Sequence, residues 1–140
     1  MSDSAPDLFP SGPWTGFFLD RRVPGRHQME LRLTFAAGRM TGEGRDRVGQ
    51  FTVDGTYATD TGKCAFTKQY DSRHAVHYAG FNEGKGIWGT WKLDDVTGGF
   101  HIWPEGMADP TVQHLSEEAE VPADGETTKK RKRKPVGAGG

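Results

Sequence analysis

The sequence predicts an all-β protein, an eight-stranded antiparallel up-and-down β-barrel, and three observations support this fold class. The 140 residues include 8 Phe, 4 Trp and 3 Tyr, and the formal net charge is −1, which together favour a folded chain over a disordered one. The 20 glycines are typical of tight turns and bent strands. Alternating apolar and polar runs recur roughly every 10–14 residues between turn signals, as in a meander of strands.

Eight such runs follow one another along residues 14–104. Most breaks between them carry Gly, Pro, Asp or Asn, as at Pro24-Gly25, because tight turns need these residues. The break at Arg47-Val48 lacks them. Eight strands can close into a small barrel, which removes both sheet edges, and a two-sheet sandwich is the alternative. The predicted strands are Trp14–Asp20, Arg26–Ala36, Arg39–Asp46, Gly49–Tyr57, Lys63–Tyr70, His74–Asn82, Lys85–Leu93 and Gly98–Pro104.

The composition changes near Pro104, after which no aromatic residue occurs. Asp109 can cap a short C-terminal helix that begins at Pro110, and Val112, Leu115 and Ala119 would share one face of it. Charged residues dominate the end of the chain, as is typical of disordered tails. We therefore expect a flexible leader over residues 1–11, a barrel domain with this helix over 12–121, and a disordered charged tail over 122–140.

The tripeptide Gly12-Pro13-Trp14 opens the first predicted strand. Together with the eight-strand meander it resembles the calycin group, the lipocalins and avidin-type barrels, whose first strand begins with Gly-x-Trp. The resemblance implies that Trp14 packs at one end of the barrel and that the interior holds a small ligand. The biotin-binding residues of avidin have no match position by position, and a lone Cys64 excludes the internal disulfides of secreted lipocalins. The resemblance therefore supports a barrel and, by analogy, a ligand carrier.

One charged residue, Lys68, falls in the middle of a strand face that is otherwise apolar. A buried ammonium must find a partner or lose its charge. Lys68 would therefore hold the anionic group of a partly apolar ligand; alternatively, it pairs internally with Asp46 or faces water. The predicted ligand-binding residues are Lys68, Asp46, Tyr70, His74, Tyr78 and Trp91.

Glycine is frequent on the same predicted inward face. Gly42, Gly44, Gly55 and Gly89 lie there, and Gly89 is expected to pair with Tyr78 of the preceding strand. A glycine at such a position either lets the sheet bend sharply or leaves space in the interior. The sequence leaves both alternatives open.

The outward face predicts an exposed aromatic patch. Trp88 and Trp103 are expected to pair across the last hairpin, with His77 and His101 in the adjoining row. Exposed aromatic patches often mark interaction sites. A contact between copies of the chain, or cover by the helix after Asp109, is the alternative. The two histidines are expected two strands apart, which is too far for a shared metal without bending.

A basic run lies near the C-terminus, at Lys129, Lys130, Arg131, Lys132, Arg133 and Lys134. In a eukaryotic protein this run has the pattern of a nuclear-localisation signal. In a bacterial protein it would bind nucleic acid or another anionic surface without sequence preference and in a salt-dependent way. A solubilising tail is the alternative.

Several function classes lack their motifs in this sequence. No Gly-x-Ser-x-Gly elbow, Walker loop or His-Glu-x-x-His motif occurs, and no apolar run is long enough for a transmembrane helix. No signal peptide opens the chain, so we expect an intracellular protein, cytoplasmic or, in a eukaryote, nuclear. We expect no cofactor and no metal. An acid–base pair of Asp46 and His74 is the enzymatic alternative.

The predicted function is therefore non-enzymatic binding of a small molecule inside the barrel. The ligand would be anionic and partly apolar, because a lysine lies among aromatic side chains. The alternative is an interaction module, which would use the outer Trp/His face for a protein partner and the basic C-terminal tail for nucleic acid.

Overall fold

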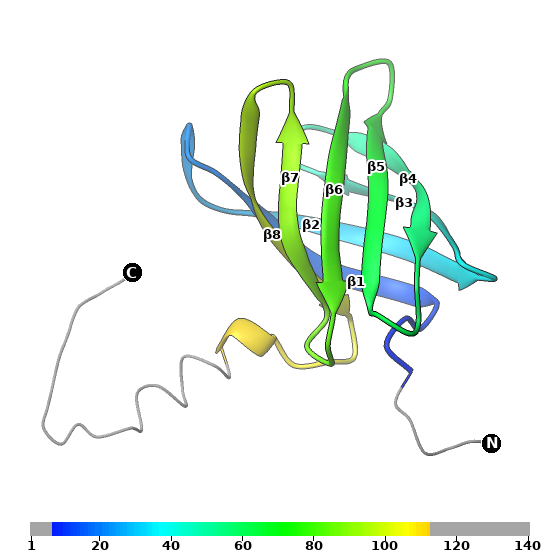
Figure 1. The fold of residues 1–140 in the computed structure, drawn as a ribbon. Helices are drawn as coiled ribbons and strands as arrows, with labels where there is room; N and C mark the ends of the chain where they lie inside the picture. Colours follow the sequence, from blue (N-terminus) through cyan, green and yellow to red (C-terminus); the bar gives the residue numbers. More distant parts are fainter. Residues whose placement is uncertain (1–6, 113–140) are drawn as a thin grey trace, which may run out of the picture. The chain divides into compact units, whose positions relative to one another are not determined.

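A computed structural model describes residues 7–112, which contain an eight-stranded closed barrel and one short helix. Each strand pairs antiparallel with the next, and β1 also pairs with β8, which closes the sheet. Figure 1 shows β5, β6 and β7 side by side in the near wall of the barrel. The predicted fold class is confirmed. The strands are β1 (Gly12–Asp20), β2 (Val23–Ala36), β3 (Arg39–Asp46), β4 (Gln50–Tyr57), β5 (Lys63–Tyr70), β6 (Ala75–Asn82), β7 (Ile87–Leu93) and β8 (Val96–Pro104).

Buried and exposed side chains alternate along the strands, and the buried ones fill the interior of the barrel. Strand β5 is an example. Phe66, Lys68 and Tyr70 are buried, whereas the neighbouring Ala65 and Gln69 are exposed. Successive side chains of a strand point to opposite faces of the sheet, so every second residue reaches the core. Lys68 therefore lies inside the barrel.

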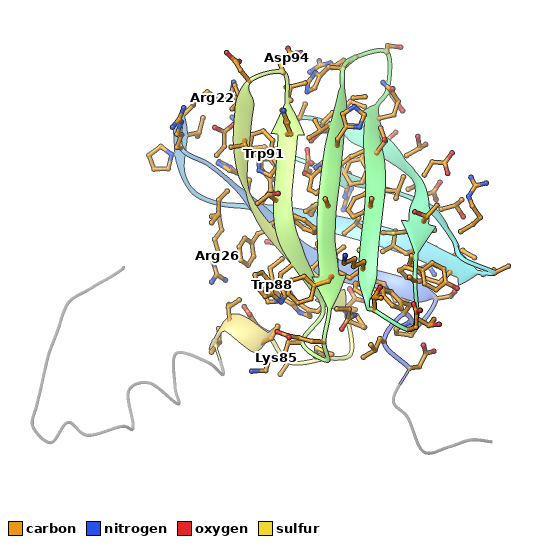
Figure 2. All side chains as sticks on the ribbon, in the orientation of Figure 1. Arg22, Arg26, Lys85, Trp88, Trp91 and Asp94 are labelled. Atoms are coloured by element: carbon orange, nitrogen blue, oxygen red, sulfur yellow. The ribbon has the colours of Figure 1, made fainter. Side chains whose placement is uncertain are left out.

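The turns divide into two groups, one at each end of the barrel. We call one end the mouth; it carries the β1–β2, β3–β4, β5–β6 and β7–β8 turns. The closed end carries the other turns and the segment before β1. Figure 2 shows Trp91 nearer the end that bears Arg22 and Asp94, which is the mouth, and Trp88 nearer Lys85 at the closed end.

The closed end is packed with aromatic rings. Phe9 is buried there, with ring centroids 4.9 Å from Tyr57 and 5.4 Å from Phe35. Trp14 is 1% exposed, packs against Phe35 at 5.6 Å and donates its indole N–H to the Pro10 carbonyl at 2.9 Å. Trp14 thus lies at one end of the barrel, in the position that the sequence resemblance implied.

The strand register agrees with the prediction only in part of the sheet. Phe66 pairs with both Gly55 and Tyr78, as expected. In the next hairpin, however, Tyr78 pairs with Trp91 and not with Gly89. The β6–β7 turn spans residues 83–86 and is longer than the predicted Glu83-Gly84 turn, which shifts the register by two residues.

The last hairpin is shifted in the same way. Trp88 pairs with His101, so the expected pairing of Trp88 with Trp103 is wrong. The reason is a short turn: β8 already begins at Val96, directly after Asp94 and Asp95. A shift of two residues leaves every side chain on its original face, which is why the barrel interior was still predicted correctly.

The inward glycines leave no empty space in the barrel. A Cβ at Gly55 would collide with the Ala65 carbonyl oxygen, and a Cβ at Gly44 would overlap the Phe51 ring. Neighbouring backbone or side chains therefore already occupy the place of the missing side chain. Of the two alternatives that the sequence left open, the structure supports sharp bending at these positions, not empty space.

The chain divides into two units between Met107 and Ala108. In the second unit a short helix begins at Pro110, and the Asp109 carboxylate accepts hydrogen bonds from the backbone N–H of Thr111 at 2.8 Å and Val112 at 3.4 Å. The predicted cap is therefore present. The helix positions Leu115 and Ala119, the leader before residue 7 and the charged tail lie outside the described residues. Residues 7–112 contain no helix long and apolar enough to cross a membrane.

Candidate functional site

A cavity of about 240 Å³ opens at the mouth of the barrel. Four of the six predicted ligand-binding residues line it: Tyr70, His74, Tyr78 and Trp91. Phe18 completes the aromatic wall, and Arg22 and Arg47 stand at the rim. The other two predicted residues, Lys68 and Asp46, lie behind this wall. The structure therefore brings the six residues together at one end of the barrel.

Lys68 and Asp46 form an ion pair in the interior. The Lys68 ammonium lies 2.7 Å from Asp46 Oδ2, and the two side chains are 1% and 0% exposed. The same Asp46 oxygen accepts a hydrogen bond from the Tyr70 hydroxyl at 2.6 Å, and Oδ1 accepts one from the Val48 backbone N–H at 2.9 Å. Of the alternatives for Lys68, the internal pair with Asp46 is the one observed.

Four aromatic rings surround the Lys68 ammonium. Its Nζ lies 4.7 to 5.1 Å from the ring centroids of Phe18, Phe51, Tyr70 and Tyr78, and 3.8 Å from the Met29 sulfur. Cations over aromatic faces are attracted by the ring quadrupole. Burial nevertheless lowers the pKa of Lys68 to about 8, and the charge and hydrogen bond of Asp46 only partly oppose this shift.

Tyr78 is the most informative group in the cavity wall. The residue is 3% exposed, yet its hydroxyl makes no hydrogen bond to any residue in the described part of the chain. Its ring is held by stacking on Phe66 at 4.9 Å and by an edge contact with Phe100 at 4.8 Å. Burial, and to a lesser extent the charge of Asp46, raises the pKa of Tyr78, so the phenol remains protonated and can donate.

Trp91 forms a rigid part of the same wall. Its indole N–H donates to the Leu19 carbonyl at 2.8 Å, and its ring meets Phe18 edge-on at 6.3 Å. Its pairing partner is Gly98, where any side chain would overlap the indole. Gly98 thus makes room for Trp91 to lie flat against β8.

Two arginines line the cavity at its rim, one with an ion-pair partner among the described residues and one without. Arg22 binds Asp20 through two hydrogen bonds of 2.9 and 2.7 Å, and this interaction lowers the pKa of Asp20 to about 2. Arg47 lies in the β3–β4 turn, is exposed, and forms no ion pair with any residue between 7 and 112. Its charge acts on the nearby Tyr70 phenol. Arg47 is thus the rim cation available to an incoming anion.

His74 and Asp46 lie on either side of Tyr70. The His74 ring is 5.1 Å from the Tyr70 ring, and Tyr70 donates to Asp46. The hydrogen bonds that the Asp46 carboxylate accepts within residues 7–112 come from Lys68, Tyr70 and Val48, and none of them comes from His74.

The residues of the predicted outer patch lie in different surroundings. Trp88 is 39% exposed and packs on Phe81 at 4.7 Å, whereas Trp103 is buried. His101 contacts the Trp103 ring at 5.5 Å, and its Nε2 lies 2.6 Å from the Lys85 carbonyl oxygen. His77 belongs to another part of the sheet, where it pairs with Lys92 and hydrogen-bonds Thr67.

The predicted ligand-binding set did not include several residues that line the cavity, among them Phe18, Arg22 and Arg47. Phe18 lies four residues after Trp14 in β1 and therefore on the same face of the strand. The alternation of side chains along the strand could thus have predicted that Phe18 points inward. The two arginines occupy turns, where no periodic pattern indicates direction. The basic run from Lys129 to Lys134 lies outside the described residues.

Residues 7–112 contain no cluster of three or more His, Cys, Asp or Glu side chains that could hold a metal ion. Cys64 is buried, and burial raises the pKa of its thiol to about 12, which disfavours the reactive thiolate. Comparison of the chain with family models, with curated proteins and with solved structures found no match. The class of protein is thus defined by its fold alone, a small closed antiparallel β-barrel with a polar mouth.

Proposed function

We propose that the protein is a non-enzymatic β-barrel that binds a small, anionic and partly apolar molecule in the cavity at its mouth. The observation that carries this proposal is Tyr78, a buried residue of the cavity lining whose hydroxyl has no hydrogen-bond partner among the described residues. Buried tyrosine hydroxyls usually find a hydrogen-bond partner. A ligand that enters the cavity would supply one.

The balance of charge around the cavity supports an anionic ligand. Asp20 neutralises Arg22, and Asp46 neutralises Lys68. Arg47 is left as an exposed positive charge at the rim. The aromatic walls supply apolar contact, and such a mixture of apolar walls with few polar groups is typical of small-molecule sites.

The size of the cavity limits the ligand. Its volume of about 240 Å³ lies below the range of about 300–1,000 Å³ that is usual for drug-sized ligands. A compact molecule, such as a single ring or a short chain bearing one carboxylate, fits this volume better than a lipid or a nucleotide.

The experiment that tests the proposal is native mass spectrometry of untagged protein, purified gently from its own source. We expect an adduct of no more than a few hundred daltons that is lost on denaturation. The binding place is then located by NMR with the recovered ligand: signals of Trp91 and Tyr70 should shift, while those of Trp14 at the closed end should not. A bare mass, together with unmoved mouth signals in a panel of small carboxylates, would contradict the proposal.

An interaction module is the second candidate, and the exposed Trp88 with its neighbour Phe81 favours it. In this case the basic run from Lys129 to Lys134 would bind nucleic acid through its charges. Binding to random-sequence DNA should be measured across a salt titration, with the full chain and with a chain lacking residues 129–134. Equal affinity of the two chains would exclude this use of the tail.

A further inference from the structure

Tyr78 and Arg47 line the cavity at different depths, and neither side chain makes a hydrogen bond or ion pair with a described residue. Tyr78 lies in the interior of β6, where it pairs with Trp91 and stacks on Phe66. Arg47 lies in the β3–β4 turn at the rim, three strands away around the barrel. A single ligand can reach both only if its own polar groups lie at opposite ends of its framework.

Tyr78, the deep group, is neutral, whereas Arg47, the rim group, carries a positive charge. Beneath the cavity lies Lys68, the one buried lysine or arginine among residues 7–112, and Asp46 already binds it at 2.7 Å. A second carboxylate placed there would face Asp46 and lose its hydration, which is strongly unfavourable. A neutral oxygen can instead accept a hydrogen bond from Tyr78. The carboxylate of the ligand therefore belongs at the rim beside Arg47, and the neutral end belongs inside.

The space between the two groups has flat aromatic walls. Phe18 and Trp91 meet edge-on at 6.3 Å, and the Tyr70 ring adds a third surface. Aromatic walls of this kind gain most from a planar apolar body, because rings pack in offset or edge-on arrangements. The indole of Trp91 is fixed by its bond to the Leu19 carbonyl, so the wall is formed before the ligand arrives.

We infer that the cavity selects small aromatic carboxylates that carry a neutral hydrogen-bonding group at the end of the ring opposite the carboxylate. The simplest molecule of this class is 4-hydroxybenzoate. Its carboxylate would bind Arg47, and its hydroxyl oxygen would accept the Tyr78 hydrogen bond. This inference rests on the proposed function and adds the class and orientation of the ligand.

The test is isothermal titration of the full-length protein with three probes: 4-hydroxybenzoate, benzoate and 4-hydroxybenzyl alcohol. The variant Tyr78→Phe removes only the deep hydroxyl. It should weaken 4-hydroxybenzoate by about two- to tenfold, the range of one net hydrogen bond, and leave benzoate unchanged. Arg47→Gln should weaken both carboxylates by about two- to fivefold, as expected for a partly exposed ion pair, and leave the alcohol unchanged.

Two matched controls lie away from the mouth. Tyr57→Phe removes a tyrosine hydroxyl at the closed end, and Arg39→Gln removes an arginine that pairs with Asp54 on the outer face. Neither should alter the affinity for any probe. Higher salt should weaken both carboxylates in the wild type and have a smaller effect in Arg47→Gln, because salt screens exposed charges.

The outcomes separate this inference from the proposed function. If carboxylates bind at the mouth but Tyr78→Phe weakens benzoate as much as 4-hydroxybenzoate, or Arg47→Gln weakens the alcohol equally, the inferred class is wrong and the proposed function stands. If no probe binds and the protein from its source carries no adduct, both fail. Should Tyr78→Phe not fold, the Tyr78 ring signal of wild-type protein labelled at tyrosine must shift with 4-hydroxybenzoate and not with benzoate; equal shifts overturn the inference.

Discussion

The two ends of the barrel fill their interiors with different chemistry. At the closed end, Phe9, Phe35 and Tyr57 pack ring against ring, and burial of their apolar surface stabilises the fold. At the mouth, the buried pair of Lys68 and Asp46 occupies the corresponding space. The attraction within such a pair roughly offsets the cost of removing both charges from water. The closed end is therefore stabilised by apolar burial, whereas the ion pair at the mouth adds little net stability of its own and leaves polar groups beside a cavity.

The largest expected effect comes from breaking the ion pair at the mouth. Lys68→Met leaves the Asp46 carboxylate buried without its cation, and we expect the free energy of unfolding to fall by about 3–5 kcal/mol. Urea denaturation at pH 7, with wild type and variant compared at equal concentration, measures this change.

The matched control for this prediction is the double variant with Lys68→Met and Asp46→Asn. Asparagine keeps one oxygen for the Val48 N–H, and its amide N–H can donate to the Tyr70 hydroxyl oxygen in place of the second carboxylate oxygen. Because it carries no charge, most of the lost stability should return. A double variant as unstable as the single one would show that the ion pair is not what distinguishes the mouth from the closed end.

At the closed end, Phe9→Ala should lower the free energy of unfolding by about 3 kcal/mol, since it removes a buried ring from contact with Phe35 and Tyr57. The loss should be the same at pH 7 and pH 9, because no charge is involved. Thermal unfolding at the two pH values checks this. If the loss of stability caused by Phe9→Ala depends on pH, the closed end and the mouth are energetically coupled.

Gly55 in β4 allows a test of the close packing between neighbouring strands. Gly55→Ala places a methyl group against the Ala65 carbonyl and the Phe66 backbone, and should cost about 1–3 kcal/mol. Gly99→Ala is the control, because the added methyl group meets no atom closer than 3.8 Å. Chemical denaturation of both variants measures the difference, and equal stabilities would show that the sheet can relax around Gly55.

The smallest effect is a pH dependence that belongs to the mouth alone. Since the folded protein releases the Lys68 proton near pH 8 and the unfolded chain near 10.5, the unfolded state binds more protons in this window. Stability should therefore rise between pH 8 and 9, by at most about 1.4 kcal/mol per pH unit. Above pH 9, Cys64 contributes the opposite sign, because its thiol ionises at lower pH when unfolded.

Urea denaturation at pH 7.5, 8, 8.5 and 9 follows this rise, with Lys68→Met as the control. The difference in stability between wild type and variant should change across the series, because only the wild type loses the Lys68 proton. If the two profiles are parallel, Lys68 remains fully charged in the folded protein and its desolvation is weaker than we infer.

Much of the fold follows from local patterns. Alternation assigned Phe66, Lys68 and Tyr78 to the interior, and this assignment survived even where the register was wrong, because the errors were of two residues. The register itself depends on turn length. Composition alone does not show that the β6–β7 turn has four residues or that the turn before Val96 is short.

The sequence predicted those site residues that lie on strands, but not the features of the site that depend on distances between atoms. Tyr70, Tyr78 and Trp91 were placed at the cavity by strand parity. Arg47 was missed because a turn residue follows no period. The most informative fact, that the Tyr78 hydroxyl is left without a partner among the described residues, depends on the separation of atoms in three dimensions, and no sequence pattern encodes it.

The pairing of β1 with β8 has a consequence for engineering. Trp14 is the partner of Pro104, so the first strand begins where the last one finishes, at the closed end. A linker from the end of β8 to the segment before Phe9 would keep Phe9 and all of β1, and new chain ends could be opened in the Asp94-Asp95 turn at the mouth. Such a circularly permuted barrel would keep all eight strand pairings and place two attachment points for reporter groups beside the cavity.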